Sequence, residues 1–290
     1  MLSPRKNKSL GMPGHYVAPQ TGAVTSADDA LLDDYKALND PERRRAIERR
    51  GGFFVVEGTL ALEALLGSEF PVRSVLAAAR KAEAVRSLVG GRAPVVVRPD
   101  AEVEAITGFP FHRGVLAAAD RRPLPGLGDV LRGAELVVVA EGLSDHENVG
   151  ALFRNAAAFG VDAVLLDPAT ADPLYRRSVR VSLGHVLRVQ WTRLAAWPDG
   201  LGELRRRGFE LLALTPAAQA VPIDAVARDI AARRPKVALL VGAEGPGLSD
   251  AALVASERRV RIPIARSVDS LNVATAAAVA LHRLSRFDPA

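Results

Sequence analysis

The chain alternates short apolar runs with longer segments in which apolar residues recur every three to four positions. Between residues 53 and 120 the apolar runs are FFVVEG, VRSVLAAA, PVVVRP and GVLAAAD, with helical patterns between them. From residue 136 the alternation begins again with LVVVAEG and continues to residue 286. Short apolar runs predict buried strands and the segments between them predict helices, so we expect two α/β units.

Two stretches without a buried face mark the expected domain limits. Residues 1–27 mix glycine, proline, serine and basic residues and are expected to form a flexible tail. The helical pattern ADDALLDDYKALNDPERRRAIERR follows, and the first domain is expected to span 28–120. Proline and glycine cluster again in RRPLPGLGDVLRG, so 121–134 is expected to be a linker and 135–290 the second domain.

Composition narrows the possible chemistry. The chain has no cysteine, which excludes disulfides, thiol catalysis and cysteine-ligated metal and is consistent with a cytoplasmic protein. We expect neither a membrane segment nor a metal. The net charge is +5, and 33 of the 38 basic residues are arginine. The arginine fork suits phosphate, which favours a nucleic-acid partner, although a GC-rich genome would give the same bias.

The first candidate site is ENVGALFRNAAAFGVDAVLL, residues 147–166. Its apolar spacing predicts a helix that Asn148 caps and Gly160 ends, followed by a buried strand. Asn148 and Arg154 would therefore lie where the chain leaves the carboxyl end of a strand, which is where open α/β sheets bind ligands. Taken alone, a helix cap and a solvated arginine explain this pair.

The second candidate is the glycine-rich loop in LVGAEGPGLSD, residues 240–250, which follows the apolar run KVALLVG. The loop lacks the Gly-Lys-Ser of a phosphate-binding P-loop, and its glycine order differs from the dinucleotide fingerprint. It offers a backbone that a ligand can approach closely, with Glu244 as its charged group. We expect Ser249 to cap the next helix, and a purely structural turn remains the alternative.

The third candidate is RIPIARSVDSLNVATAAAVALHRLSRF, residues 261–287. Here Ile262 to Ile264 are expected to end a strand, and Ser270 and Asn272 lie at the start of an alanine-rich helix. Such a helix suits a dimer interface or a close internal contact. Helix capping again explains the polar residues locally, but three polar loops that each follow a strand favour one shared site.

Together these stretches are similar to the three motifs of the SpoU, or TrmH, family of SPOUT methyltransferases. The match runs in order over residues 135–287 and includes Asn148, Gly150, Arg154 and Gly160, then VGAEGPGL, IPI and DSLNVATAAAVAL. Residues 42–119 also resemble that family's amino-terminal substrate-binding domain, which is like ribosomal protein L30e. The chain departs from the family pattern at Arg266, where many relatives have glycine, and at Ala274, where serine is common.

The resemblance implies a carboxyl-terminal SPOUT α/β domain with a deep trefoil knot, a homodimer, and S-adenosylmethionine as methyl donor. The expected reaction is methylation of a ribose 2'-hydroxyl of RNA. The additional amino-terminal domain favours ribosomal RNA over transfer RNA. A transfer RNA methyltransferase, a non-catalytic RNA-binding or ribosome-assembly protein of the same fold, and a small-molecule methyltransferase are the alternatives.

The resemblance also implies residue roles. Thr215, Gly242, Ile262 and Leu271 are expected to hold the methyl donor. Arg154 matches the catalytic arginine, and because guanidinium resists deprotonation we expect it to stabilise the developing alkoxide or hold a phosphate. The residues expected to orient Arg154 and the ribose are Asn148, Glu244, Ser270 and Asn272.

Two basic stretches are candidates for holding RNA. FPFHRG contains His112 and Arg113, and YRRSVRVSLGH places Arg176, Arg177 and Arg180 along one expected helix. A solvated basic surface is the alternative for both. Because aromatic residues make up only 5% of the chain, we expect RNA shape and phosphates to determine the target.

Overall fold

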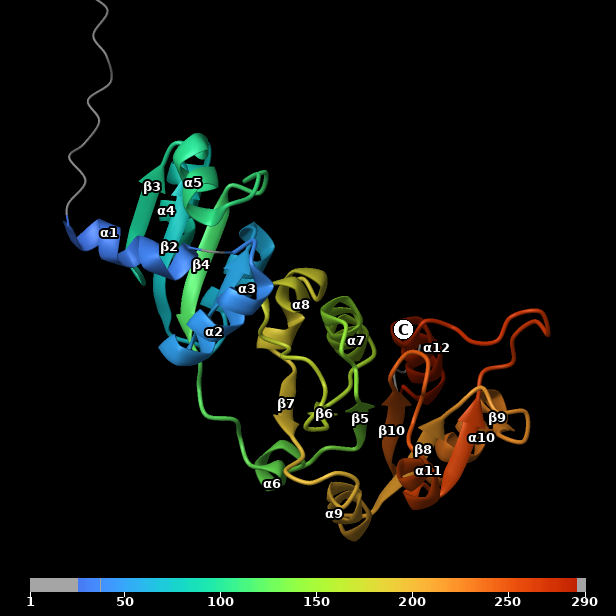
Figure 1. Cartoon of the computed structure of the whole chain (residues 1–290). Coiled ribbons are helices and arrows are strands. Elements are labelled where there is room, and N and C mark those ends of the chain that lie inside the picture. The colour runs from blue at the N-terminus through green and yellow to red at the C-terminus, as the bar shows by residue number, and fades with distance from the viewer. Residues whose placement is uncertain (1–25, 37, 286–290) are drawn as a thin grey trace, which may run out of the picture.

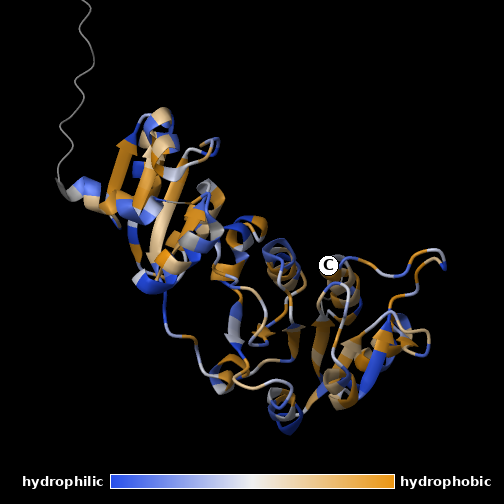
Figure 2. Cartoon of the chain, in the orientation of Figure 1, coloured by the Kyte–Doolittle hydropathy of each residue, from blue (hydrophilic) through white to orange (hydrophobic). Residues whose placement is uncertain are grey.

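The computed structural model describes residues 26–36 and 38–285 and has the predicted α/β architecture (Figure 1). The expected tail lies outside these residues, except that its last two positions begin the first helix. Figure 2 shows that most strands of the two sheets are hydrophobic, whereas the strands of 190–193 and 258–261 are more hydrophilic and the helices carry residues of both kinds.

The amino-terminal unit contains, within the described residues, a four-stranded sheet of order β1-β4-β2-β3, in which only β2 and β3 are parallel. Both faces of β1 are buried: Phe54 and Val56 pack against α3, and Phe53 and Val55 pack against the turn that contains Tyr35. The elements are β1 (Phe53–Glu57), α3 (Thr59–Leu66), β2 (Val72–Ala78), η2 (Ala79–Lys81), α4 (Ala82–Val89), β3 (Val95–Arg98), α5 (Asp100–Thr107) and β4 (Val115–Asp120).

The sequence pattern suggested one helix before β1, but the structure contains three shorter segments there. These are α1 (Ser26–Leu32), η1 (Asp33–Tyr35) and α2 (Pro41–Gly51). Proline fits the first position of a helix and disfavours helical geometry in the residue before it, so α2 begins at Pro41. The buried Tyr35 hydroxyl donates to the carbonyl of Ser74 at 2.8 Å, which holds the intervening turn against the sheet.

The second unit contains a seven-stranded sheet in the described part of the chain, of order β7-β6-β5-β10-β8-β11-β9, and every neighbouring pair is parallel. The carboxyl ends of its strands therefore lie at one edge, and the strands are β5 (Leu136–Glu141), β6 (Ala163–Leu166), β7 (Gln190–Arg193), β8 (Phe209–Leu214), β9 (Val221–Pro222), β10 (Lys236–Gly242) and β11 (Arg258–Arg261).

Helices cover both faces of this sheet. One hydrophobic cluster joins the sheet to α7, α8, α10 and α12, and a second joins it to α6, α9 and α11. The helices are α6 (Leu127–Val130), α7 (His146–Ala158), α8 (Arg176–Val181), η3 (His185–Leu187), α9 (Gly200–Arg206), α10 (Ile223–Arg233), α11 (Asp250–Ala255) and α12 (Val273–Leu284). The expected linker is thus not irregular throughout, because α6 forms within it and buries Val130 and Leu131.

Arg176 connects the two units. Its guanidinium donates to Glu57 Oε2 at 2.7 Å and to the carbonyl of Leu38 at 3.2 Å, and lies over the Phe109 ring, 4.5 Å from its centroid. Arg176 is on α8, whereas its partners belong to the amino-terminal unit. The arginine that we expected to hold RNA is therefore engaged within the chain.

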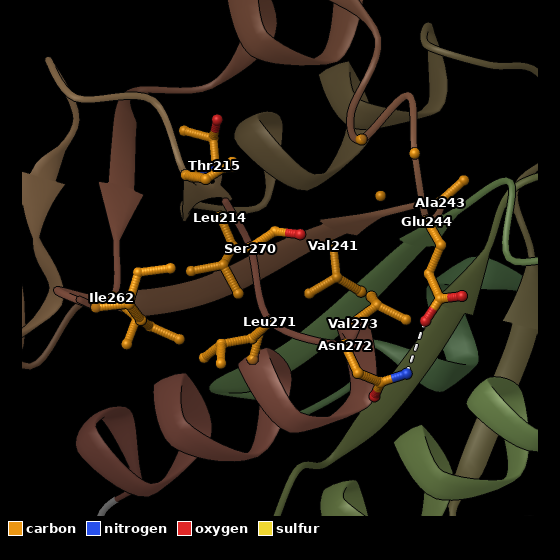
Figure 3. Close-up of a pocket in the computed structure, with 16 residues that line it drawn as sticks. Leu214, Thr215, Val241, Ala243, Glu244, Ile262, Ser270, Leu271, Asn272 and Val273 are labelled. Carbon is orange, nitrogen blue, oxygen red and sulfur yellow. Dashed lines mark hydrogen bonds between the residues drawn. The ribbon is translucent and has the colours of Figure 1, made fainter. Parts of the chain in front are cut away.

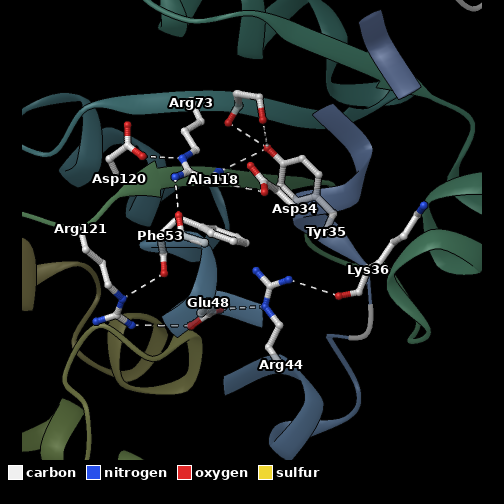
Figure 4. A network of polar contacts seen from close by, with 12 residues as sticks. Asp34, Tyr35, Lys36, Arg44, Glu48, Phe53, Arg73, Ala118, Asp120 and Arg121 are labelled. Atoms are coloured by element: carbon white, nitrogen blue, oxygen red, sulfur yellow. Dashed lines mark hydrogen bonds and ion pairs between the residues drawn. The ribbon is translucent and has the colours of Figure 1, made fainter. Parts of the chain in front are cut away.

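A second polar network begins in the amino-terminal unit, where Figure 4 shows it around α2 and the end of β4. Arg44 and Glu48 on α2 are both buried and paired, with 2.8 Å between Nε and Oε1. Arg121, which follows β4, donates to the carbonyl of Phe53 at 3.0 Å and to Asp172 of the second unit at 2.6 Å. Burial raises the pKa of Glu48, and the neighbouring arginines partly offset this rise. The network joins α2, β1 and the second unit.

The contact between α7 and α8 depends on Gly150. A Cβ at this position would lie 2.6 Å from the Ser178 carbonyl oxygen and 2.8 Å from Val181 Cβ, so a side chain would push the helices apart. We predict that Gly150→Ala lowers the free energy of unfolding by roughly 1–3 kcal/mol. Gly202→Ala is the matched control, because its nearest neighbour would be the flexible end of Arg206 at 3.5 Å. Equal thermal denaturation midpoints for the two variants would contradict the prediction.

Candidate active site

A cavity of about 440 Å³ opens at the carboxyl edge of the seven-stranded sheet, beside the ends of β8, β10 and β11 (Figure 3). All four residues expected to hold the methyl donor line it, as do Glu244, Ser270 and Asn272. The lining is otherwise mostly apolar. Its residues are Leu214, Thr215, Pro216, Val241, Gly242, Ala243, Glu244, Gly245, Gly247, Ile262, Ile264, Ser270, Leu271, Asn272, Val273 and Ala276.

The loop after β10 folds back onto the end of its own strand. The amide of Gly247 donates to the carbonyl of Ala243 at 3.0 Å. A Cβ at Gly242 would lie 2.2 Å from the Gly247 carbonyl carbon and 2.3 Å from the Leu248 nitrogen, which no side chain tolerates. The absence of a Cβ at Gly242 is thus what allows this wall of the cavity to form.

Two residues outside the three motifs support this loop. Glu141, at the buried end of β5, accepts from the backbone amide of Ser249 at 2.9 Å and from the Trp197 indole at 2.5 Å. A carboxylate at the end of an apolar central strand was a signal for Glu141 in the sequence, because a buried charge requires partners. No local pattern indicated Trp197.

Asn272 joins the three motifs. Its side-chain nitrogen donates to Asn148 Oδ1 at 2.8 Å and to Glu244 Oε1 at 2.7 Å. Its oxygen accepts from the amides of Ala274 and Thr275, which confirms the predicted cap of α12. We refer to Asn148, Glu244 and Asn272 as the amide–carboxylate cluster.

The predicted cap of α7 is wrong. Asp145 caps this helix by accepting from the amide of Glu147 at 2.8 Å, and Asn148 lies one turn inside it, buried. Asn148 is therefore available to contact Asn272. The predicted Ser249 cap is confirmed, because its hydroxyl accepts from the amide of Ala252 at 3.2 Å. The strand expected to reach Ile264 ends at Arg261, so Ile262 lies in the following loop.

Arg154 lies apart from this cluster. It is exposed on α7 and does not line the cavity. Six helical positions separate it from Asn148, which places it about 240° around the helix axis. Asn155, nearly in line with Asn148, instead donates to the carbonyl of Ala274 on α12 at 2.8 Å. Burial lowers the pKa of His185, and the charges of Arg188 and Arg154 lower it further, so Arg154 lies on the η3 side.

The structure brings three of the basic residues expected to hold RNA around one buried carboxylate. Glu57 lies 2.7 Å from Arg176, 3.6 Å from Arg113 and 3.9 Å from Arg180. Arg177 pairs with Glu147 at 2.6 Å, and His112 is exposed. Arg266 is exposed in the loop after β11 and is not among the residues that line the cavity.

The described residues offer neither a metal site nor a helix that spans a membrane. Their histidine, aspartate and glutamate side chains form no group of three or more that could hold a metal ion. None of their helices is long and apolar enough to cross a membrane.

The chain is an α/β protein with a cavity at the carboxyl edge of a parallel sheet, which is where open sheets of this kind bind ligands. The model of the SpoU rRNA methylase family matches residues 135–282. An uncharacterized tRNA/rRNA methyltransferase of Mycobacterium tuberculosis is 45% identical over 265 residues, which are 91% of each chain. The chain belongs to the SpoU rRNA methylase family, as its three motifs predicted.

Three other similar proteins have a named activity or a solved structure. The 23S rRNA (guanosine-2'-O-)-methyltransferase of Bordetella pertussis is 33% identical over 179 residues, 60% of this chain and 71% of that one. The rRNA methyltransferase of Sinorhizobium meliloti with bound S-adenosylmethionine has a TM-score of 0.72 and 26% identity, covering 90% of this chain and 96% of that one. The SpoU methyltransferase AviRb of Streptomyces viridochromogenes, also solved with that cofactor, has the same fold, with a TM-score of 0.74, 21% identity, and 88% and 97% coverage.

Because Asn272 both caps α12 and holds the cluster together, its loss should destabilise the protein more than the loss of a helix cap alone. Asn272→Ala removes a helix cap and both cluster bonds, whereas Ser249→Ala removes a cap alone. Loss of a cap costs about 1 kcal/mol. We therefore predict that Asn272→Ala lowers the free energy of unfolding by roughly 1 kcal/mol more than Ser249→Ala, since two further hydrogen bonds are lost. Denaturant titration of the two variants measures the difference, and equal losses would contradict the bridging role.

Proposed function

We propose that this protein transfers a methyl group from S-adenosylmethionine to a ribose 2'-hydroxyl of ribosomal RNA. The observation that carries the proposal is the cavity, with the amide–carboxylate cluster drawn from all three motifs beside it. The family description, the guanosine-2'-O activity in the name of the Bordetella relative, and the bound cofactor in the Sinorhizobium relative support it.

The cavity suits the methyl donor. Its volume of about 440 Å³ lies in the range of small-molecule sites, and Leu214, Val241, Ile262 and Leu271 offer apolar surface for an adenine. None of the sixteen described residues that line it is a lysine or arginine, so it offers no side-chain counter-charge for a phosphate chain. Glu244 is the acidic residue among them and suits a cationic ligand. Loop backbone and Thr215 supply polar contacts.

When bound, the donor supplies an electrophilic methyl group on a positively charged sulfur. The hydrogen bonds within the cluster indicate which of its atoms are already engaged and which can contact the substrate. Both N–H donors of Asn272 are used, by Asn148 and by Glu244, and its oxygen caps α12, so Asn272 is a positioning residue. Glu244 Oε2 and the side-chain nitrogen of Asn148 remain to contact the ribose. In this arrangement Glu244 accepts the hydroxyl proton, while Ser270 on the cavity wall contacts the sugar.

We propose that Arg154 acts from a second copy of the chain. Arg154 does not line the cavity of its own chain and is exposed on α7, and Val279 on α12, which packs against α7, is 37% exposed. A homodimer formed through these helices would cover Val279 and carry Arg154 to the cavity of the other copy. There its fixed positive charge would stabilise the developing alkoxide or hold the adjoining phosphate.

Several finer assignments belong to the same proposal. We propose that the segment 262–272 passes through the loop after β10 to form a deep trefoil knot, since both segments line one cavity. We assign 28–120 to an L30e-like RNA-binding domain, 121–134 to a linker and 135–290 to the methyltransferase domain. This additional domain favours ribosomal over transfer RNA, and we assign the reaction to the cytoplasm.

The reaction is tested by incubating the protein with labelled S-adenosylmethionine and separated ribosomal and transfer RNA, followed by digestion to nucleosides. We predict label in a 2'-O-methyl nucleoside of ribosomal RNA. Glu244→Gln is expected to lower the rate at least about 100-fold, because the proton acceptor is lost while shape is kept. Label only in transfer RNA would show that transfer RNA, and not ribosomal RNA, is the substrate. The proposed activity would be contradicted by donor binding without transfer to any RNA.

The shared site is tested by mixing two inactive variants. Arg154→Ala and Glu244→Gln chains, expressed together, should regain about a quarter of the wild-type activity, because half of the dimers are mixed and each holds one complete site. Each variant alone is the control. If Arg154 serves the cavity of its own chain, the mixture stays inactive.

A further inference from the structure

A second cavity, of about 420 Å³, lies at the junction of the two units and is separate from the methyl-donor cavity. Arg45 on α2 contributes one wall. His146, the first residue of α7, and Tyr175, the residue before α8, contribute another, together with Arg177 and Arg180. Both units of the chain therefore build this junction cavity.

The junction cavity contains a pair of rings. The centroids of His146 and Tyr175 are 4.3 Å apart, with an angle of 46° between the ring planes, and both side chains are half-buried. Burial lowers the pKa of His146, and Arg45 and Arg177 add to this effect, which favours the neutral imidazole. An aromatic surface that is partly open to solvent suits an unpaired nucleobase, which stacks without requiring one base identity.

The charge of the junction cavity suits a phosphate. Four arginines and one glutamate, Glu57, line it, and Glu57 is most closely engaged by Arg176 at 2.7 Å. Arg177 is 54% exposed in its pair with Glu147, and Arg180 is 35% exposed at 3.9 Å from Glu57. Both guanidinium groups are therefore accessible to an incoming anion, and arginine presents a fork that matches phosphate oxygens.

The first turn of α7 carries a residue of each neighbourhood. His146 lines the junction cavity, and Asn148, two residues further, bonds Asn272 beside the methyl-donor cavity. Two helical positions correspond to about 3 Å along the axis and about 200° around it, so the two side chains leave opposite sides of the helix. An RNA strand with one ribose at Asn148 therefore reaches His146 with a flanking nucleotide by passing across the amino-terminal end of α7.

We propose that the junction cavity holds an unpaired RNA nucleotide that flanks the one that is methylated. Its base stacks on Tyr175 and His146, and its phosphate is held by Arg177 and Arg180. This inference rests on the proposed function and adds to it a site that selects the flanking nucleotide, so the enzyme reads an unpaired segment at the junction as well as the target ribose.

The test compares Tyr175→Ala with Tyr175→Phe, which keeps the ring. For methylation of ribosomal RNA, Tyr175→Ala should raise KM at least about 5-fold, because loss of base stacking is felt in RNA binding, with the Kd of S-adenosylmethionine unchanged. Tyr175→Phe should remain near wild type. Arg177→Ala should also raise KM, and it replaces Tyr175→Ala if that variant fails to fold.

A second readout locates the contact. Ribosomal RNA containing 5-iodouridine is irradiated with the wild-type protein, and the crosslinked peptides are identified by mass spectrometry. Crosslinks at His146 or Tyr175 support the proposal. Methylation with unchanged KM in Tyr175→Ala and Arg177→Ala, with crosslinks elsewhere, would overturn it while leaving the proposed function intact.

If wild-type protein methylates no RNA, the proposed function fails and the junction cavity is judged by binding alone. In that case, loss of ribosomal RNA affinity in Tyr175→Ala but not in Tyr175→Phe would still support a nucleotide site. Equal affinity of both variants would reject it.

Discussion

The candidate site depends on one close contact, in which the backbone after β10 returns against the end of its own strand. The space around Gly242 is filled by the backbone of Gly247 and Leu248, and a Cβ there would lie within 2.5 Å of three of their atoms. Glu141 also holds the end of this loop, because its carboxylate accepts from the amide of Ser249. Only with the loop in this position do β8, the segment after β11 and the start of α12 enclose one cavity. The glycines therefore shape a wall, which explains why no lysine accompanies them.

Two polar residues each make two kinds of contact that the fold requires. Asn272 begins α12 and also bonds Asn148 and Glu244, so the end of a helix and the arrangement of the site are fixed together. Arg176 likewise neutralises the buried Glu57 while joining the two units. Because buried polar groups require partners, these contacts resist rearrangement. The position of the amino-terminal unit beside α8 is thus linked to the geometry of the surface that we propose to contact RNA.

The sequence predicted the four strands of the first sheet and β5, β6 and β10 of the second, because apolar runs such as KVALLVG have no other environment that suits them. It did not indicate the short β7 and β9, which lack such runs. Of the residues that it selected for the donor and the reaction, seven line the cavity, whereas Asn148 and Arg154 do not. It failed where a tertiary contact outweighs a local preference: Asn148 resembles a cap, but Asp145 serves that role and leaves Asn148 to Asn272. The junction cavity was not foreseeable as a whole, since His146 and Arg45 are about a hundred positions apart and only the packing of the units brings them together.

The central claim is that the folded-back loop creates a cavity for S-adenosylmethionine. Calorimetric titration of S-adenosylmethionine into the wild type and into Gly242→Ala tests it most directly, with circular dichroism to confirm that both are folded and ATP as the comparison ligand. We expect the wild type to bind S-adenosylmethionine and not ATP, and folded Gly242→Ala to lose that binding. Equal binding by both proteins, or binding of ATP in place of S-adenosylmethionine, would contradict the account.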